Sequence, residues 1–393
     1  MSDSAEEVVE ELDSLGHLTG VEVEEEDLGG PVDGPDFIQT PFDPELIDVV
    51  TRNTTVDLML SRVRTRRVDL QPDFQRRAGI WRNQAKSRLI ESLLLRIPLP
   101  TFYAAEDDDE VWAMVDGIQR LTTIVEFVEP DAIDAEPLRL RNLEYLGEEY
   151  DNASFAELPP RLQTRLRETE LIVHLIRRGT PDEVKFNIFA RINTGGLPLS
   201  RQELRHALIP GEGRSILKEW ADSEAFKSTT GYSVRSDRMA DREMILRFLA
   251  FRLADPFTYA DDDFDAFLRS SMRSLNKLRK ARVDELWEEF ERAMNGAYEI
   301  FGNYAFRKVE RRGGTRRLPI NKALFESVSV NLAMLTEEEI SVLTRRRRRV
   351  ERKFLDLMSD VDFQAAISQG TGDPAKVRFR FEAIKEIFTS AVA

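Results

Sequence analysis

The chain has 393 residues, no cysteine and a formal net charge of −15, with 41% hydrophobic and 32% charged residues. This length and composition are typical of a soluble protein with two or three domains, and the lack of cysteine excludes disulfides, thiol chemistry and cysteine-based zinc sites. The sequence contains no apolar run long enough to span a membrane and starts unlike a secretory signal peptide, so we expect a cytoplasmic protein.

The negative charge is concentrated near the N-terminus. Residues 1–50 hold 16 Asp or Glu and no Lys or Arg, so the other 55 acidic residues nearly balance the 56 basic ones. A block of one charge sign is usually solvated, and we therefore predict a disordered acidic tail over residues 1–44. An alternative is that the tail mimics nucleic acid or masks a basic groove on the same chain.

Strand and helix patterns are mixed between residues 45 and 210. Apolar residues at helical spacing predict a helix over 83–96, which the sequence Ile-Pro-Leu-Pro ends. Short apolar runs predict strands at 101–105, 111–115 and 170–176, and residues 161–168 are expected to form a short helix. The sequence therefore predicts an α+β domain with a small sheet.

Beyond residue 200 the strand patterns fade. Ser200 and Glu203 form a capping box at the start of the first expected helix. We predict an all-helical domain over residues 211–393, and the expected helices from the capping box onward are 200–208, 213–226, 239–254, 261–275, 282–301, 320–335, 336–358 and 375–391.

The most informative segment is residues 111–128. Its expected strand stops at Asp116 and Gly117, and a helix with Leu121 on its apolar face begins at once. Glycine lets an anion approach the backbone, and the first helical turn presents free N–H groups. Arg120 is disfavoured by the helix dipole at this position, which indicates an anion for it to bind. The alternative without a ligand is that Asp116 only caps the helix.

Two other segments carry polar groups suited to a ligand. In residues 71–81, Gln75 and Arg76 precede a helix, and Arg76 has the fork geometry for a phosphate. The turn at Asn193 and Gly196 offers backbone amides to a ligand. An ordinary surface loop is the alternative for residues 71–81, and an ordinary helix C-terminus is the alternative for the turn. His206 is expected on a helix surface rather than at a catalytic site.

Two arginine-rich runs in the second domain are candidates for DNA phosphates, although the same side chains can pair with the acidic tail or with glutamates upstream. The candidate DNA-binding residues are Arg311, Arg312, Arg316, Arg317, Arg345, Arg346, Arg348 and Arg349.

Taken together, PDFQRRAGIW at 72–81, DGIQRLTTI at 116–124 and NTGGLPLSRQELR at 193–205 resemble the N-terminal domain of GmrSD-type restriction endonucleases. The resemblance implies a fold related to ParB and sulfiredoxin, a small mixed sheet with helices that binds nucleotide at a strand-to-helix turn. It also implies NTP binding and hydrolysis coupled to restriction of phage or modified DNA.

The chain departs from the family pattern in two ways. The family's DGQQR has Ile118 in place of the first Gln, so hydrolysis is in doubt if that Gln contacts nucleotide, whereas the change is harmless if the position faces the core. Two-domain members carry a C-terminal HNH nuclease domain, and three scattered histidines cannot build one here. Sulfiredoxin-type redox chemistry is excluded because its cysteine is missing.

The resulting hypothesis is an NTP-binding module, with hydrolysis left open, in a DNA restriction or anti-phage defence system. Asp116, Gln119 and Arg120 are the candidate catalytic residues, with Asp116 positioning Mg²⁺ or water. The candidate nucleotide contacts are Gln75, Arg76, Gly117, Arg120, Asn193 and Gly196. The alternatives are a metal-dependent DNA nuclease and a non-enzymatic adaptor that senses DNA for a partner ATPase or nuclease subunit. Assembly into a homo-oligomer is also left open.

Overall fold

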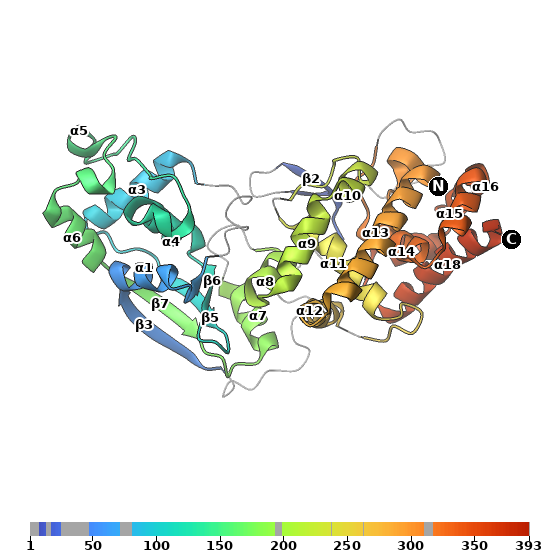
Figure 1. Ribbon diagram of the computed structural model, residues 1–393, viewed down its shortest axis with the longest axis horizontal. Helices are drawn as coiled ribbons and strands as arrows, with labels where there is room; N and C mark the ends of the chain where they lie inside the picture. The colour runs from blue at the N-terminus through green and yellow to red at the C-terminus, as the bar shows by residue number, and fades with distance from the viewer. Residues whose placement is uncertain are drawn as a thin grey trace, which may run out of the picture. The chain divides into compact units, whose positions relative to one another are not determined.

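The computed structural model describes residues 8–12, 17–24, 47–70, 81–192, 199–236, 238–261, 263–309 and 317–392, without the side chains of residues 190–192. The chain forms two compact units (Figure 1). The α/β unit comprises residues 38–199, and the helical unit comprises residues 200–393 together with residues 1–37. The chain therefore starts in the helical unit, passes through the α/β unit and returns.

The α/β unit is built on a five-stranded mixed sheet in the order β3-β7-β5-β6-β4. The strands are β3 (Val49–Thr55), β4 (Val68–Asp69), β5 (Phe102–Glu106), β6 (Trp112–Asp116) and β7 (Glu170–Ile176). The β3–β7 and β5–β6 pairs are antiparallel, and the β5–β7 and β4–β6 pairs are parallel. This confirms the predicted fold class, a small mixed sheet with helices followed by a helical region.

One face of this sheet is buried. In β7, Leu171, Val173 and Leu175 are buried, whereas Ile172 between them is 42% exposed. This alternation is typical of a strand with one face on the core.

Four helices surround the sheet: α1 (Val56–Arg64), α3 (Asn83–Leu94), α4 (Ile118–Val128) and α6 (Pro160–Glu168). The short elements η3 (Pro130–Ile133), α5 (Gly147–Tyr150) and η4 (Phe155–Glu157) lie between α4 and α6, and α7 (Asp182–Ile192) follows β7.

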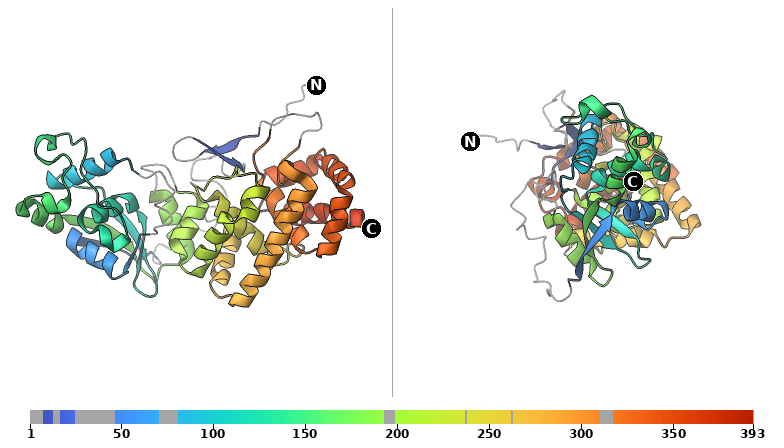
Figure 2. Two further views of the ribbon diagram at one scale, coloured as in Figure 1. Left: turned by 45° about the horizontal axis from the view of Figure 1, so that its top comes forward. Right: turned by 90° about the vertical axis from the view of Figure 1, so that its left-hand side faces the viewer.

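The helical unit is organised around two helices, α11 (Ala240–Leu253) and α14 (Lys322–Ala333), which pack on each other and are buried on nearly all sides. A helix without an exposed face belongs to the centre of a domain. The outer elements are α8 (Arg201–Leu208), α9 (Glu212–Asp222), α10 (Glu224–Thr229), α12 (Phe264–Leu275), α13 (Lys280–Phe301), η6 (Gly302–Tyr304), α15 (Glu337–Arg345), α16 (Arg347–Leu357), α17 (Val361–Ser368) and α18 (Pro374–Val392) (Figure 2).

Part of the acidic N-terminal segment is folded, unlike the disordered tail expected over residues 1–44. Strands β1 (Glu10–Leu12) and β2 (Leu18–Glu22) form an antiparallel hairpin within the helical unit. Thr19 and Val21 are fully buried, and Val21 pairs with Ile320 in a parallel bridge. The number of acidic residues alone predicts disorder. It does not reveal that Glu22 and Glu24 pair with buried cations.

Two expected helices are each divided in two. The segment 213–226 forms α9 and α10, separated at Ser223, whose hydroxyl caps α10. The segment 336–358 forms α15 and α16, separated at Arg346. The arginine run at 345–349 therefore crosses a junction between helices and does not wind around one helix. None of the described helices is long and apolar enough to cross a membrane.

Candidate functional site

The turn between β6 and α4 requires glycine. Gly117 has a φ of 88°, in the left-handed region that other residues rarely adopt. A Cβ atom there would lie 2.4 Å from Cδ1 of Phe102, so the backbone and the ring are in close contact. The strand therefore turns directly into the helix, as the sequence predicts, and α4 begins at residue 118. The N–H groups of a first helical turn have no acceptor within the helix.

Asp116 and Arg120 form an ion pair across this turn. Nη2 of Arg120 donates to Oδ2 of Asp116 at 2.9 Å, and the side chains are 11% exposed for Arg120 and 38% exposed for Asp116. The guanidinium also donates to the carbonyl of Thr101 at 3.1 Å and to that of Pro100, and it lies 4.6 Å from the Phe102 ring centre. The arginine is therefore fixed in place, while the carboxylate is the more accessible partner.

The electrostatics of the pair follow from this burial. Removal from water lowers the pKa of Arg120, and the Asp116 carboxylate partly offsets that effect. The anion that stabilises an arginine in the first turn of α4 is, in this structure, Asp116 itself. A phosphate placed here would meet a pre-positioned guanidinium but would also have to share it with a carboxylate, unless a metal ion or proton neutralises that carboxylate.

Ile118 is part of the hydrophobic core. Its side chain is only 4% exposed, the same value as for the buried Val115 of β6. Ile118, the residue that departs from the DGQQR pattern, therefore faces the interior. This is the case in which the exchange of Gln for Ile is expected to be harmless. Gln119, the next residue, is half-buried, as are Asp116 and Arg120.

A row of polar and aromatic side chains on the sheet face that carries Ile172 leads to Asp116. Strand pairing places Thr51 opposite His174, His174 opposite Tyr103, and Tyr103 opposite Asp116. Thr51 Oγ1 and His174 Nδ1 lie 3.1 Å apart, and the rings of Tyr103 and His174 have centres 4.9 Å apart. Sequence reasoning missed Tyr103 and His174, although the alternation in β7 could have placed His174 on the face opposite the core.

Several predicted site residues lie outside the described part of the chain. These are Gln75, Arg76, Asn193 and Gly196 of the nucleotide set and Arg311, Arg312 and Arg316 of the DNA set. Among the described residues, no group of three or more His, Asp or Glu side chains is arranged to hold a metal ion.

The remaining arginines of the DNA set have different local roles. Arg317 is exposed and donates to the Thr230 carbonyl at 3.0 Å. Arg346 donates to the carbonyl of Ala391 at 2.7 Å, at the end of α18. Arg345, Arg348 and Arg349 are exposed on α15 and α16, which leaves their charges accessible to a polyanion.

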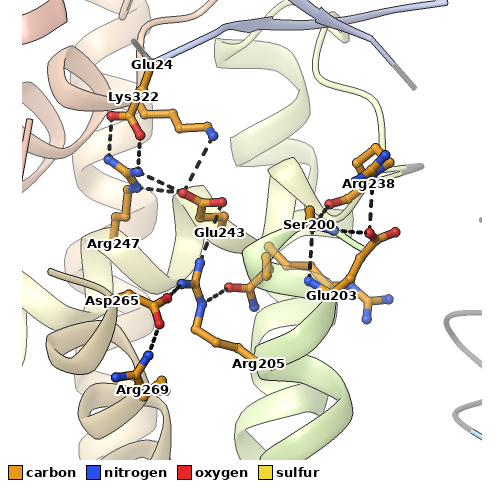
Figure 3. Close-up of polar contacts among 12 residues, drawn as sticks. Glu24, Ser200, Glu203, Arg205, Arg238, Glu243, Arg247, Asp265, Arg269 and Lys322 are labelled. Carbon is orange, nitrogen blue, oxygen red and sulfur yellow. Dashed lines mark hydrogen bonds and ion pairs between the residues drawn. The ribbon is translucent and has the colours of Figure 1, made fainter. Parts of the chain in front are cut away.

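The Glu-Leu-Arg end of the third motif is buried in the helical unit (Figure 3). Glu203 forms the predicted capping box with Ser200 and lies 3.3 Å from Nε of Arg238. Arg205 donates to Gln202 at 2.9 Å and pairs with Asp265 and, at 3.6 Å, with Glu243. These motif residues hold α8 against α11 and α12, and their role is structural.

His206 is buried, which corrects the expectation that it lies on a helix surface. It is 2% exposed, and Nδ1 lies 3.3 Å from Nη1 of Arg242, which donates to it. Burial, together with the nearby charges of Arg214, Arg242 and Lys218, lowers the pKa of His206 to about 2. The imidazole is therefore neutral at physiological pH.

The structure thus contains an α/β unit, in which β6 turns through Gly117 directly into α4, and a helical unit. Residues 59–210 match the family model of the GmrSD restriction endonuclease N-terminal domain. This segment is therefore similar to a domain of this restriction family, and the match includes the Asp116–Arg120 turn and the buried Glu203 and Arg205. No curated protein and no solved structure matches the chain significantly.

Proposed function

We propose that the chain is an NTP-binding module of a DNA restriction or anti-phage defence system. The observation that carries the proposal is the Asp116–Gly117–α4 turn, lying within the segment that matches a restriction-family domain. Gly117 lets β6 turn directly into α4 beside the Phe102 ring, and a helix N-terminus at this turn favours phosphate oxygens.

The described residues fit a nucleotide phosphate in defined roles. Arg120 is already anchored by two backbone carbonyls, so little side-chain entropy is lost when it contacts a phosphate. Asp116 keeps an exposed portion that can hold Mg²⁺ or a water, and Gln119 offers a neutral amide beside it. A bound Mg²⁺ would supply positive charge to the phosphates and relieve the repulsion between them and Asp116.

Tyr103 and His174 extend the proposed site along the sheet. A half-buried pair of aromatic rings beside Asp116 offers a ring face on which a nucleobase can stack. Stacking is tolerant of base identity, so this surface favours nucleotides over inorganic polyphosphates without selecting one base.

Hydrolysis, in this proposal, depends on positioning and charge. Ile118 belongs to the core, so the family departure removes no side chain from the turn. Asp116 and Gln119 are the groups that can orient a water, and Arg120 is the group that can stabilise developing negative charge on phosphate oxygens. No covalent intermediate is required.

DNA is the proposed macromolecular partner. The exposed cations at Arg317, Arg345, Arg348 and Arg349 belong to the helical unit and can contact phosphates. DNA affinity that falls steeply with salt would support this assignment, while affinity independent of salt would contradict it.

A nucleotide panel read by thermal shift tests the proposal directly. We expect at least one NTP with Mg²⁺ to raise the melting temperature, because a ligand that binds only the folded state stabilises it. No shift with any nucleotide would contradict the proposal. Cleavage of plasmid DNA by the purified chain alone would instead support the nuclease alternative.

A further inference from the structure

The turn that follows α10 in the helical unit presents a tyrosine to solvent. The helix ends in a Schellman motif, in which the N–H of Gly231 donates to the Ser228 carbonyl at 2.9 Å and the N–H of Tyr232 donates to the Lys227 carbonyl at 2.7 Å. In such a motif the residue after the glycine often packs back on the helix. Tyr232 holds this position but is 65% exposed, so its ring is not used to close the end of α10.

The backbone of Tyr232 is strained. Gly231 has a φ of 63°, which the Schellman motif requires and which glycine adopts readily. Tyr232 has a φ of 53°, in the same left-handed region, which a bulky side chain rarely adopts. The motif requires this conformation at the glycine only. Strain of this kind is concentrated at sites where the chain holds a ligand, and we therefore searched around the tyrosine for further binding groups.

The exposed ring is held in one orientation. The hydroxyl of Tyr232 donates to the Glu224 carboxylate, and this hydrogen bond raises the pKa of the tyrosine. Glu224 lies in the first turn of α10, where the helix dipole favours a carboxylate. A ring that is already fixed loses little conformational entropy when a flat group stacks on it. Tyr232 therefore has the properties of a pre-positioned stacking surface.

A cationic side chain lies directly beside the turn. Arg317 donates through Nη2 to the Thr230 carbonyl at 3.0 Å and through Nη1 to the Gly231 carbonyl at 3.4 Å. A Cβ atom on Gly231 would lie 1.6 Å from Nη2 of Arg317, so the guanidinium rests on the glycine backbone. Arg317 is exposed, and no carboxylate in the part of the chain that the structure describes forms an ion pair with it.

Arg307 adds a second positive charge behind the turn. It is 2% exposed, and its acceptors are uncharged: the Thr230 carbonyl at 2.9 Å, Oγ of Ser233 at 2.6 Å and one further carbonyl. Burial and the charge of Arg317 lower the pKa of Arg307 to about 10, and the charge of Glu10 offsets this only in part. The guanidinium is still charged at physiological pH, so two arginine charges converge on the Thr230 carbonyl.

The acidic groups near the turn have partners of their own. Glu224 accepts from the tyrosine hydroxyl, and Asp222 pairs with Lys227 at 3.1 Å. The C-terminal end of a helix contributes about half of one negative charge, which is less than the charge of one arginine. Arg317 can therefore attract an anion from solution, with the charge of Arg307 behind it.

An exposed ring beside an exposed guanidinium suits single-stranded nucleic acid, in which bases stack on aromatic side chains and phosphates meet cations. We propose that the turn at Tyr232 and Arg317 binds an unpaired nucleotide of DNA, with the base on the Tyr232 ring and an adjacent phosphate on the Arg317 guanidinium. The inference rests on DNA as the partner in the proposed function, and it adds that the helical unit recognises unpaired DNA here. A base inside a duplex is stacked on its neighbours and cannot reach the ring.

Fluorescence anisotropy with the full chain and labelled probes of equal length tests this proposal. The probes are oligo(dT), an abasic strand that keeps the phosphates but has no bases, and a blunt duplex. We expect the wild type to bind oligo(dT) more tightly than the abasic strand. Tyr232→Ala should weaken the binding of oligo(dT) roughly 5- to 150-fold and leave the binding of the abasic strand unchanged, because only stacking is lost.

Three further variants separate the ring from the charge. Tyr232→Phe keeps the ring and should bind oligo(dT) as the wild type does. Arg317→Ala should weaken the binding of oligo(dT) and of the abasic strand by the same factor and make the affinity less dependent on salt. The matched control is Tyr298→Ala, which removes a tyrosine that is 49% exposed on α13 of the same unit and should change neither affinity.

The outcomes distinguish this inference from the proposed function. Equal loss for oligo(dT) and the abasic strand in Tyr232→Ala would overturn stacking. Duplex binding as tight as oligo(dT) binding, and insensitive to Tyr232→Ala, would overturn the preference for unpaired DNA and leave DNA as the partner. No binding of any probe would contradict the DNA partner itself. The wild type needs no substitution: equal affinities for oligo(dT) and the abasic strand would overturn the inference even if a variant failed to fold.

Discussion

Glu24 and Arg247 form a buried two-point ion pair although they are 223 positions apart in the sequence. Arg247 also bonds to Glu243, one turn earlier on α11, and lies 3.6 Å from Glu326 on α14. Burial opposes ionisation of Glu24, but the charges of Arg247 and Lys322 outweigh it and lower the pKa of Glu24 to about 2. An N-terminal carboxylate is thus part of the centre of the helical unit.

Glu24→Gln should destabilise the protein markedly. Breaking a buried ion pair by neutralising one partner costs about 3 to 5 kcal/mol. Because the folded pKa of Glu24 is lowered, its contribution is present above pH about 4.5 and is lost as the pH falls towards 2. Urea unfolding should therefore show a large difference between wild type and variant at pH 7 that shrinks below pH 4.5.

The control for this variant is Glu351→Gln, which neutralises an exposed carboxylate on α16 and should change stability by less than about 0.5 kcal/mol. Equal effects of the two substitutions would show that Glu24 is not a buried counter-charge.

His206→Gln should flatten the pH dependence of stability at mildly acidic pH. His206 stays neutral in the folded protein, whereas in the unfolded chain it takes up a proton below pH about 6.5. Wild-type stability should therefore fall as the pH drops from 7 to 5, by at most about 1.4 kcal/mol per pH unit. Urea unfolding curves at pH 7, 6 and 5 give the free energy of unfolding as a function of pH. The same dependence on pH in the variant and the wild type would contradict this explanation.

Ile118→Gln, which restores the family residue, should lower stability without increasing NTP hydrolysis. The position is 4% exposed, and an amide buried without a partner costs about 1 to 3 kcal/mol. The melting temperature and the rate of phosphate release would be measured together. A faster rate in a stably folded variant would show that this position contacts the nucleotide.

Tyr103→Ala should separate base recognition from phosphate recognition. Loss of stacking weakens binding by roughly 1 to 3 kcal/mol, or about 5- to 150-fold, for an NTP. Affinity for inorganic triphosphate should be unchanged, and Tyr103→Phe should behave as wild type. If Tyr103→Ala weakened the binding of the NTP and of inorganic triphosphate by the same factor, Tyr103 would be a structural residue and not a stacking surface.

The elements near the turn could be predicted from sequence because their signals are local. The expected strand 170–176 matches β7, and the Ser200–Glu203 capping box is present as predicted. The apolar run ending in Asp-Gly placed β6 and α4 correctly, since glycine and helical periodicity act within a few residues.

Tertiary partners could not be read in this way. The sequence does not show that Glu24 meets Arg247, or that the arginine run at 345–349 is interrupted at Arg346. Likewise, Tyr103 and His174 come together only through the parallel pairing of β5 with β7. Such contacts depend on topology, which charge counts and periodicity do not encode.

In the proposed site, Arg120 holds a nucleotide phosphate at the β6–α4 turn. Calorimetric titration of wild type and Arg120→Ala with the NTP that gives the largest thermal shift tests it most directly, with the exposed Arg161→Ala on α6 as the matched control. We expect the Arg120 variant, verified as folded, to bind the NTP about 10- to 100-fold more weakly, because a charge-assisted hydrogen bond is lost. The control variant should bind the NTP as the wild type does. Equal affinities in all three proteins, or no binding in any of them, would contradict the account.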